Sequence, residues 1–227
     1  MSAESPPDQA HVGILGGTGD QGRGLALRLA QSGLRVTIGS RDAARAEDIA
    51  ASLGHNVRGA TNRDCAAAAD VVIVAVPYAG HAELLASLNA ELTDKIVIDC
   101  VNPLGFDKQG PYPLQVAEGS AAQQAQQVLP DSIVVGAFHH VSAQLLLDPG
   151  VMTLETDVLV LGDVREATDQ VQALVDRIPG MRGVYGGRLR NAGQVEALTA
   201  NLIAINRRYK GHSGLRVTGC DARPPLQ

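Results

Sequence analysis

The sequence predicts an α/β fold in which a doubly wound, mostly parallel sheet carries helices on both faces and a small C-terminal lobe docks onto it. Three observations predict this class. Short β-rich runs alternate with Ala-rich stretches along the 227 residues, as in repeated βαβ units. The segment Asp70–Val76 is almost continuously apolar, as expected of a strand buried on both faces. A glycine-rich turn at residues 16–22 stands between the first expected strand and the first expected helix.

The N-terminal half supplies the clearest patterns. A strand at residues 11–15 precedes a helix at 22–32, where Leu25 and Leu29 repeat at helical spacing and Gly33 ends the helix. A strand at 34–39 and a helix at 42–53, ended by Gly54, come next, and then a short strand at 56–58 and a helix at 63–69. Pro77 ends the strand at 70–76, and a helix at 81–88 leads to a strand at 95–99.

The C-terminal half continues the alternation with less regular spacing. Residues 102–119 are rich in Gly and Pro and are expected to form a loop, followed by a short helix that ends near Leu129. Strands are expected at 132–138, 157–161 and 182–185, and helices at 164–178 and 192–209, before a Gly-rich tail. We therefore divide the chain into a flexible acidic tail at 1–10, a nucleotide-binding domain at 11–140 and the small lobe at 141–227.

Composition narrows the classes of protein that fit. With 45% hydrophobic residues the chain can build a globular core. It has neither an apolar run of about 18 residues nor a secretory signal, so we expect no membrane partner. Its three cysteines lie far apart without a CxxC pair, which favours a cytoplasmic location and argues against a metal site. A net charge of −5 and 3% aromatic residues argue against a nucleic-acid partner.

The C-terminal end is basic although the whole chain is acidic. Residues 181–227 carry a net charge of +6 when Lys and Arg are counted against Asp and Glu. Such a segment could attract an anionic ligand, and a solvated helix end or a subunit contact explains the charge equally well.

Residues 16–22 contain the spacing of a dinucleotide-binding fingerprint, Gly17-x-Gly19-x-x-Gly22. In the Rossmann fold the first glycine allows a tight turn, the second lets the backbone approach a pyrophosphate, and the third lets the helix pack against the strand. The helix N-terminus adds free N–H groups and a partial positive charge. We therefore expect a coenzyme pyrophosphate at this turn.

The end of the second expected strand selects the nucleotide. Sites for NAD usually place an acidic residue there to hold the ribose hydroxyls, whereas this chain has Ser40 and Arg41. A hydroxyl can donate to a 2′-phosphate and a guanidinium can grip it, and Arg45 lies one helical turn further on. Asp42 is acidic, and we expect it to cap the following helix. These residues favour NADP(H) over NAD.

The ordered motifs together resemble the F420-dependent NADP reductase family over nearly the whole chain. The motifs that carry the resemblance are GGTGDQG at 16–22, GSR at 39–41, VAVPY at 74–78, DCVNPL at 99–104, GAFHH at 136–140, RNAG at 190–193 and NRRYKG at 206–211. The resemblance implies hydride exchange between NADP(H) and coenzyme F420, with the rings face to face and little acid–base catalysis. It also implies a homodimer.

The same resemblance implies cofactor-binding roles for individual residues. Gly17, Thr18, Gly19, Asp20 and Gln21 would line the pyrophosphate turn, and Ser40, Arg41 and Arg45 would hold the 2′-phosphate. The nicotinamide ring and its ribose would be bordered by Val76, Pro77, Tyr78 and Ala137. The deazaflavin would lie near Asn102, Pro103, His139 and Asn191. The phosphate and glutamyl tail of F420 would lie near Arg190, and the lobe at 141–227 would complete this site.

His139 is the one residue with a possible part in the chemistry. It follows an expected strand at the edge where doubly wound sheets bind ligands, so it could contact substrate or move a proton, or it could be a loop histidine satisfied by backbone. Two other functions fit the same first domain: an NADP-dependent reductase of a small imine or carbonyl, and a non-catalytic NADPH-sensing protein.

Overall fold

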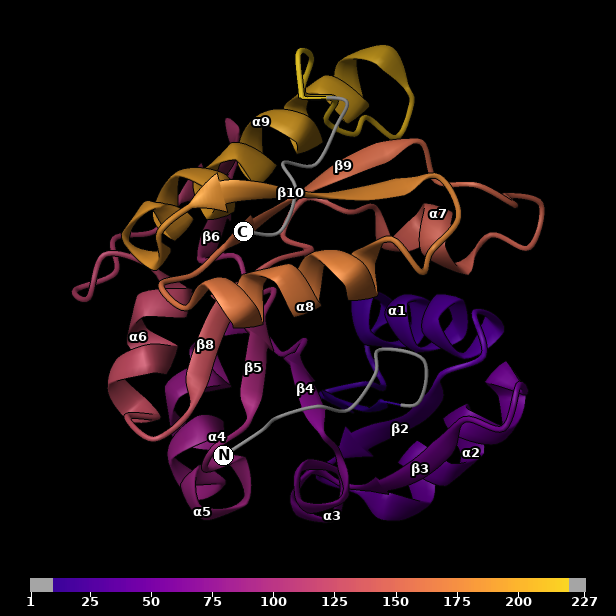
Figure 1. The fold of residues 1–227 in the computed structure, drawn as a ribbon. Coiled ribbons are helices and arrows are strands. Elements are labelled where there is room, and N and C mark those ends of the chain that lie inside the picture. Colours follow the sequence, from indigo (N-terminus) through magenta and orange to yellow (C-terminus); the bar gives the residue numbers. More distant parts are fainter. Residues whose placement is uncertain (1–9, 221–227) are drawn as a thin grey trace.

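The structure is a computed structural model that describes residues 10–220. Its main sheet has eight strands in the order β10-β9-β8-β5-β4-β1-β2-β3. The strands of this sheet are β1 (His11–Leu15), β2 (Arg35–Ser40), β3 (Arg58–Thr61), β4 (Val71–Val74), β5 (Ile96–Asp99), β8 (Ile133–Gly136), β9 (Thr156–Leu161) and β10 (Met181–Gly187). Figure 1 shows helices on both faces of the sheet.

The chain fills one half of the sheet before it returns to the other. It runs from β1 outward through β2 to β3, and then crosses back to place β4 on the opposite side of β1. Strands β1 to β5 and β8 are parallel, and β9 is antiparallel to β8. The order reverses between β1 and β4, which is where ligands of doubly wound sheets bind. The predicted fold class is thereby confirmed.

Helices alternate with these strands along the chain. Their bounds are α1 (Asp20–Gln31), α2 (Ala43–Leu53), α3 (Asn62–Ala68), η1 (Tyr78–Gly80), α4 (His81–Ser87), α5 (Asn89–Leu92), α6 (Ala121–Val128), α7 (Ala143–Leu147), α8 (Arg165–Val175), η2 (Leu189–Asn191) and α9 (Ala192–Tyr209).

Two apolar cores cover the two faces of the sheet. Strand β4 contributes Ile73 to one core and its neighbours Val72 and Val74 to the other. Successive strand residues point to opposite faces, so a strand that is buried on both sides must be apolar throughout. This explains why Asp70–Val76 has no polar alternation.

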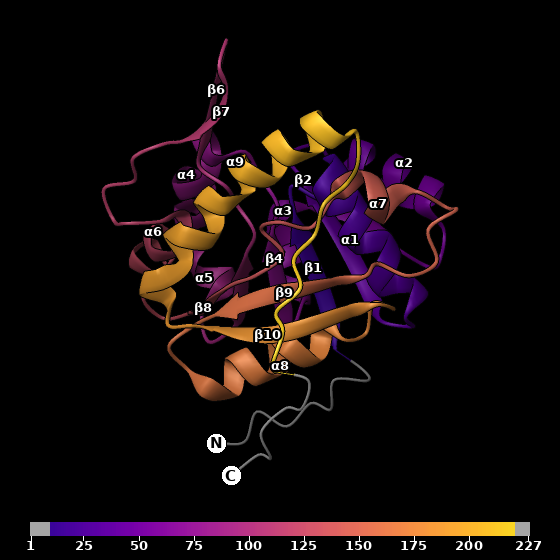
Figure 2. The ribbon, with the colours of Figure 1, turned by 90° about the horizontal axis from the view of Figure 1, so that it is seen from above.

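The segment 102–119 differs from the expected loop. It contains an antiparallel hairpin of β6 (Leu104–Asp107) and β7 (Gly110–Pro113), which projects from the body of the molecule in Figure 2. The Asp107 carboxylate accepts the Gln109 and Gly110 N–H groups at the turn. The expectation was wrong because prolines are compatible with a two-stranded ribbon, where one edge of each strand needs no donor.

Two smaller differences also have local causes. The strand expected at 56–58 is β3, which begins at Arg58 because His55 and Asn56 are left-handed, with φ of 51° and 59°. Helix α7 was not expected at all. The Ser142 side chain caps α7 by accepting the Leu145 N–H. A helix of five residues is too short to show a helical period in the sequence.

The C-terminal part continues the sheet. Strands β9 and β10 extend it beyond β8, so the predicted boundary at residue 140 falls inside one continuous sheet. After α9 the chain returns across β9 and β10, as Figure 2 shows. Most of the tail predicted at 1–10 lies outside the described residues. The division into a domain and a lobe stays a prediction.

Candidate functional site

One edge of the sheet gathers most of the predicted site residues. Strands β1, β2, β4, β5 and β8 run parallel, so their carboxyl ends meet at this edge. The segments that leave those ends are 16–21, 40–45, 76–78, 102–103 and 137–139. Five segments that are distant in sequence thus meet at the carboxyl edge of the sheet, as expected for this fold class.

The fingerprint turn is held against the end of β2. The Gly17 N–H donates to the Gly39 carbonyl over 3.0 Å, and Asn62 accepts the Gly16 N–H at 3.3 Å. A Cβ on Gly22 would lie 2.6 Å from the Cα of Gly17, so only glycine lets α1 begin this close to the turn. Gly19 is exposed, and the nearest atom to a Cβ placed there is the Gly16 carbonyl oxygen at 3.7 Å, so its outer side is free for a ligand.

Helix α1 begins without a side-chain cap. Its N-cap residue is Gly19, whereas α2, α3 and α6 are capped by Asp42, Thr61 and Ser120. The free N–H groups of its first turn, with the partial positive charge of the helix, suit a pyrophosphate. The nearby Asp20 carboxylate is paired with Arg23 at 2.6 Å.

The end of β2 presents two unpaired cations. Ser40 is buried and its hydroxyl accepts the Asp42 N–H at 3.2 Å. The Asp42 carboxylate accepts the Arg45 N–H at 3.3 Å, which confirms that this acid caps α2. Arg41 and Arg45 are exposed, and within residues 10–220 neither guanidinium makes an ion pair. Both are available to a phosphate.

The turns after β5 and β8 are joined through one carbonyl. The His139 carbonyl accepts from Asn102 Nδ2 at 2.7 Å and from Thr199 Oγ1 on α9 at 3.1 Å. Gln21 of α1 donates to the Phe138 carbonyl at 3.4 Å, which connects the fingerprint helix to the same turn. Phe138 is left-handed, with φ of 62°, a conformation of higher energy that often marks a functional turn.

Polar atoms between these turns lack partners. The Asn102 Oδ1 and both ring nitrogens of His139 are buried without a hydrogen bond among the described residues. The His139 side chain is only 3% exposed, and burial lowers its pKa below the ordinary value, so the ring is neutral at pH 7. Unpaired buried polar groups call for a ligand or an ordered water.

The remaining predicted residues lie near the same edge with different exposures. Tyr78 is half-buried in η1 and its hydroxyl accepts from Gln124 at 3.5 Å. The start of α9 reaches the end of β8, because a Cβ on Gly136 would lie 3.7 Å from the Cβ of Ala192. Asn191 precedes that residue and is half-buried, while Arg190 is exposed.

Sequence reasoning missed several polar residues that build this edge. Asn62 holds the fingerprint turn, and Thr199 holds the turn after β8. Glu196 on α9 accepts the Ala121 and Ala122 N–H groups at the start of α6, at 2.9 and 3.1 Å. Each of these contacts joins segments that are far apart in sequence. The sequence offered one signal for them, the acidic Glu196 in a mostly apolar part of the last helix.

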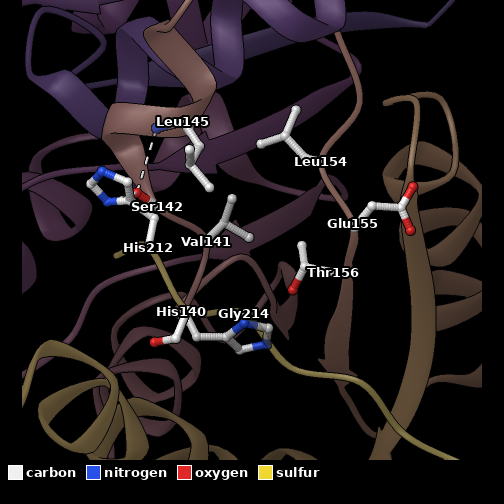
Figure 3. A pocket seen from close by; sticks show the side chains of 10 residues that line it. His140, Val141, Ser142, Leu145, Leu154, Glu155, Thr156, His212 and Gly214 are labelled. Carbon is white, nitrogen blue, oxygen red and sulfur yellow. Dashed lines mark hydrogen bonds between the residues drawn. The ribbon is translucent and has the colours of Figure 1, made fainter. Parts of the chain in front are cut away.

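A separate cavity lies between α7, β9 and the chain after α9 (Figure 3). It encloses about 40 Å³, enough for water but not for a dinucleotide. His140 lines it, and its Nδ1 has no partner among the described residues. Nε2 accepts the Leu159 N–H at 3.4 Å, and burial lowers the pKa of His140 to about 4. The His140 ring is therefore neutral at pH 7, and the cavity is too small to be the coenzyme site.

The comparisons with known proteins agree with this geometry. The model of the family "NADP oxidoreductase coenzyme F420-dependent" matches residues 11–103. An F420-dependent NADP reductase of Methanothermobacter thermautotrophicus is 38% identical over 219 residues, which cover 91% of this chain and 94% of that protein. The corresponding reductase of Methanocaldococcus jannaschii is 36% identical, over 92% of this chain and 99% of its own length.

A solved structure from an Arthrobacter species, assigned as an F420-dependent NADP reductase, superposes with a TM-score of 0.79 at 28% identity. The match covers 92% of this chain and 99% of that one. Residues 10–220 of the present chain include no helix with the length and apolar character needed to cross a membrane. On sequence identity over almost its entire length, the chain belongs to the F420-dependent NADP reductase family.

Proposed function

We propose that this protein transfers a hydride between NADP(H) and coenzyme F420 at the carboxyl edge of its sheet. The observation that carries the proposal is the unsatisfied polar surface of that edge. An uncapped helix start, two unpaired arginines and a set of buried orphan atoms lie on adjacent segments. The sequence relatives named as F420-dependent NADP reductases support the same activity.

The fingerprint turn and the end of β2 form the NADP half. Backbone groups of 17–21 would bind the pyrophosphate, with Thr18 and Gln21 beside it. Arg41, Arg45 and the Ser40 hydroxyl would bind the 2′-phosphate. Guanidinium groups suit a phosphate because they offer several donors in a plane. Metal ligation plays no part in this proposal.

The turns after β4, β5 and β8 form the deazaflavin half. Val76, Pro77, Tyr78 and Ala137 would border the nicotinamide, and Asn102, Pro103, His139 and Asn191 would border the deazaflavin. The orphan Oδ1 of Asn102 and the ring nitrogens of His139 would then gain partners on the coenzyme. The exposed Arg190 would attract the anionic tail of F420.

The protein has mainly to position two rings. When bound, the two coenzymes supply the hydride donor and acceptor carbons themselves. The turns after β4, β5 and β8 would have to hold the two rings at the contact distance of about 3–3.5 Å that such a transfer needs. The apolar Val76, Pro77 and Ala137 exclude water between them. Because His139 is neutral and desolvated, it suits a hydrogen bond to a coenzyme better than proton transfer.

We also propose a cytoplasmic homodimer for this enzyme. Phe106 on the projecting hairpin is 62% exposed and Tyr209 at the end of α9 is 77% exposed. Between the hairpin and α9, Tyr112, Ala197 and Leu198 line a groove. A second copy seated on this surface would cover it. Light scattering of the Phe106→Ser variant should show monomers if this contact forms the dimer, and an unchanged dimer would place the contact elsewhere.

The hydride-transfer assay tests the main proposal. NADPH should bleach the F420 absorbance in the presence of the protein, and FMN or simple imines should not replace F420. Replacing Arg41 and Arg45 with Ala removes charge-assisted bonds of about 1.5–3 kcal/mol each, so the KM for NADPH should rise at least tenfold while that for NADH changes little. Arg165→Ala, at an exposed position of α8, is the control for loss of a surface arginine.

The outcomes separate the rival functions. Turnover with an imine or a carbonyl but not with F420 would favour the small-substrate reductase. Tight NADPH binding without turnover of any acceptor would favour the sensing protein. Equal losses for NADPH and NADH in the arginine variant would refute the assignment of the 2′-phosphate site.

A further inference from the structure

A series of buried and partly buried hydrogen bonds connects the turn after β4 with the turn after β5. His81 Nε2 lies 2.6 Å from Asp99 Oδ2, and His81 Nδ1 lies 3.1 Å from Gln124 Oε1. The amide of Gln124 reaches the Tyr78 hydroxyl at 3.5 Å. At the other end, Asp99 Oδ1 accepts the Val101 N–H at 3.0 Å. This series of hydrogen bonds thus runs from Tyr78, after β4, to Val101, after β5.

The partners of His81 fix its protonation. Gln124 Nε2 donates to the Glu118 carboxylate at 3.2 Å, so the Gln124 atom that faces His81 is the carbonyl oxygen, an acceptor. Asp99 is an acceptor as well. A histidine with an acceptor on each ring nitrogen must donate from both, and only the imidazolium can do so. Burial alone would lower the pKa of His81, but the hydrogen bond and charge of Asp99 outweigh it and raise the pKa.

The charges around His81 all favour the cation. The side chains of His81 and Asp99 are fully buried, so water screens their attraction little. Glu118 before α6 and Glu196 on α9 are the further acids near this cluster, although burial raises the pKa of Glu196 to about 7, so its charge contributes only above that pH. Among the described residues, the Tyr78 ring packs beside His81, with 6.3 Å between the ring centroids. Loss of either member of the pair would leave a buried charge without its partner.

The positions of the two turns depend on this pair. His81 is the first residue of α4 and follows η1, so it anchors the turn that carries Val76–Tyr78. Asp99 ends β5 and its second oxygen fixes the turn that carries Asn102 and Pro103. These are the turns assigned above to the nicotinamide and the deazaflavin.

We propose that His81 is a positioning residue for hydride transfer, a buried imidazolium that clamps the β4 and β5 turns at a fixed separation through Asp99. This inference rests on the proposed function. The clamp touches neither coenzyme in the scheme above. It acts by setting how closely the two rings can approach, and a misplacement of about 1 Å is enough to slow such a step about a hundredfold.

The protonation of His81 is tested without any coenzyme. In a ¹⁵N NMR spectrum of the histidine side chains, one ring should show two protonated nitrogens from pH 6 to pH 8, and that signal should vanish in His81→Gln. In Asp99→Asn, which keeps the size and the acceptor but removes the charge, the same ring should become neutral at pH 7. A neutral His81 in the unmodified protein would overturn the proposal.

Positioning is tested by single-turnover kinetics with both coenzymes saturating. Asp99→Asn should slow hydride transfer 10- to 100-fold, while the Kd for NADPH measured by fluorescence changes less than threefold. His81→Gln, which keeps one donor toward Asp99, should lose less than His81→Ala. The control His55→Asn, at an exposed left-handed position, should leave the rate and the His81 signal unchanged and remove only the signals of His55 itself.

The outcomes distinguish the clamp from the function on which it rests. An active wild-type enzyme with an unchanged rate in Asp99→Asn refutes the clamp alone. A wild-type protein that never reacts with F420 refutes the proposed function, and the role in hydride transfer falls with it. Loss of NADPH affinity in step with rate would indicate general unfolding of the edge and would also refute the positioning role.

Discussion

The segment after α9 is held to the sheet by a buried carboxylate, and Asp157→Asn should release it. Asp157, at the start of β9, is 0% exposed and accepts from Arg182 at 2.9 and 2.6 Å. It also accepts from Arg216 at 3.2 Å and from the Val217 N–H at 2.6 Å. The last two contacts fasten the returning chain seen in Figure 2.

The size of the effect follows from the pKa. The hydrogen bonds from Arg182 lower the pKa of Asp157 from 3.8 to about 2. At about 1.36 kcal/mol per pH unit, this gap contributes about 2.5 kcal/mol to the free energy of unfolding. Because the folded pKa is depressed, the contribution is complete above pH 4–5 and is lost as pH falls through about 2. The variant also removes one acceptor from Arg182 and from Arg216, which keep the Val217 and Cys220 carbonyls and the Glu155 carboxylate, so we expect a total loss of about 3 kcal/mol at pH 7.

Urea unfolding followed by circular dichroism at pH 7 and pH 3 measures the effect. The difference between wild type and variant should shrink at pH 3, because wild-type Asp157 begins to lose its advantage there. Asp163→Asn is the control, since its pair with Arg188 is exposed and 3.6 Å long, and it should cost under about 1 kcal/mol. A loss below 1 kcal/mol in Asp157→Asn, or a difference that does not vary with pH, would refute the reasoning.

Three further variants test other parts of the edge. Gly22→Ala forces a Cβ to within 2.6 Å of the Gly17 backbone and should lower NADPH affinity at least tenfold, measured by fluorescence titration; unchanged affinity would show that the turn can shift. Burial raises the pKa of Glu196 to about 7, so the folded state favours the protonated carboxyl, and the free energy of unfolding should fall by up to about 3 kcal/mol between pH 4.5 and 8. Glu196→Gln should flatten this pH dependence in urea titrations, and an unchanged pH dependence would assign the effect to other groups. Arg28 donates to the carbonyls of Leu145, Leu146 and Asp148, so Arg28→Met should lower the free energy of unfolding by about 2–4 kcal/mol, and a loss under 1 kcal/mol would mean that water replaces the guanidinium.

The parts of this protein that sequence could predict are those encoded by neighbouring residues. The fingerprint turn and the cap of α2 are short-range features, and the structure places both where the spacing put them. The continuous apolar run at β4 likewise reported burial on both faces of the sheet. Each depends on backbone geometry within one strand–turn–helix unit, so no knowledge of the tertiary structure was needed.

The polar interior could not be predicted in this way. Asn62 meets Gly16 across 46 residues, and Thr199 meets His139 across 60. Nothing local distinguishes these residues from others of their type, since the partner is chosen by the packing of helices on the sheet. The hairpin at 104–113 was missed because its prolines are a local signal against strands. That signal applies to strands inside a sheet, whereas a two-stranded ribbon has outer edges where no N–H donor is needed.

The unsatisfied polar groups at the carboxyl edge support the coenzyme site that the motifs predict. Elsewhere, long polar side chains complete several of the fold's hydrogen bonds: Arg28 donates to the carbonyls of α7, and Asp157 accepts from the segment after α9. At the edge the start of α1 has no side-chain cap, and within residues 10–220 the two ring nitrogens of His139 have no hydrogen-bond partner. A buried orphan group costs about 1–3 kcal/mol. Under the proposed function, pairing of these groups with the bound coenzymes would offset that cost, and the buried His81–Asp99 pair would hold the two turns in position before the coenzymes bind.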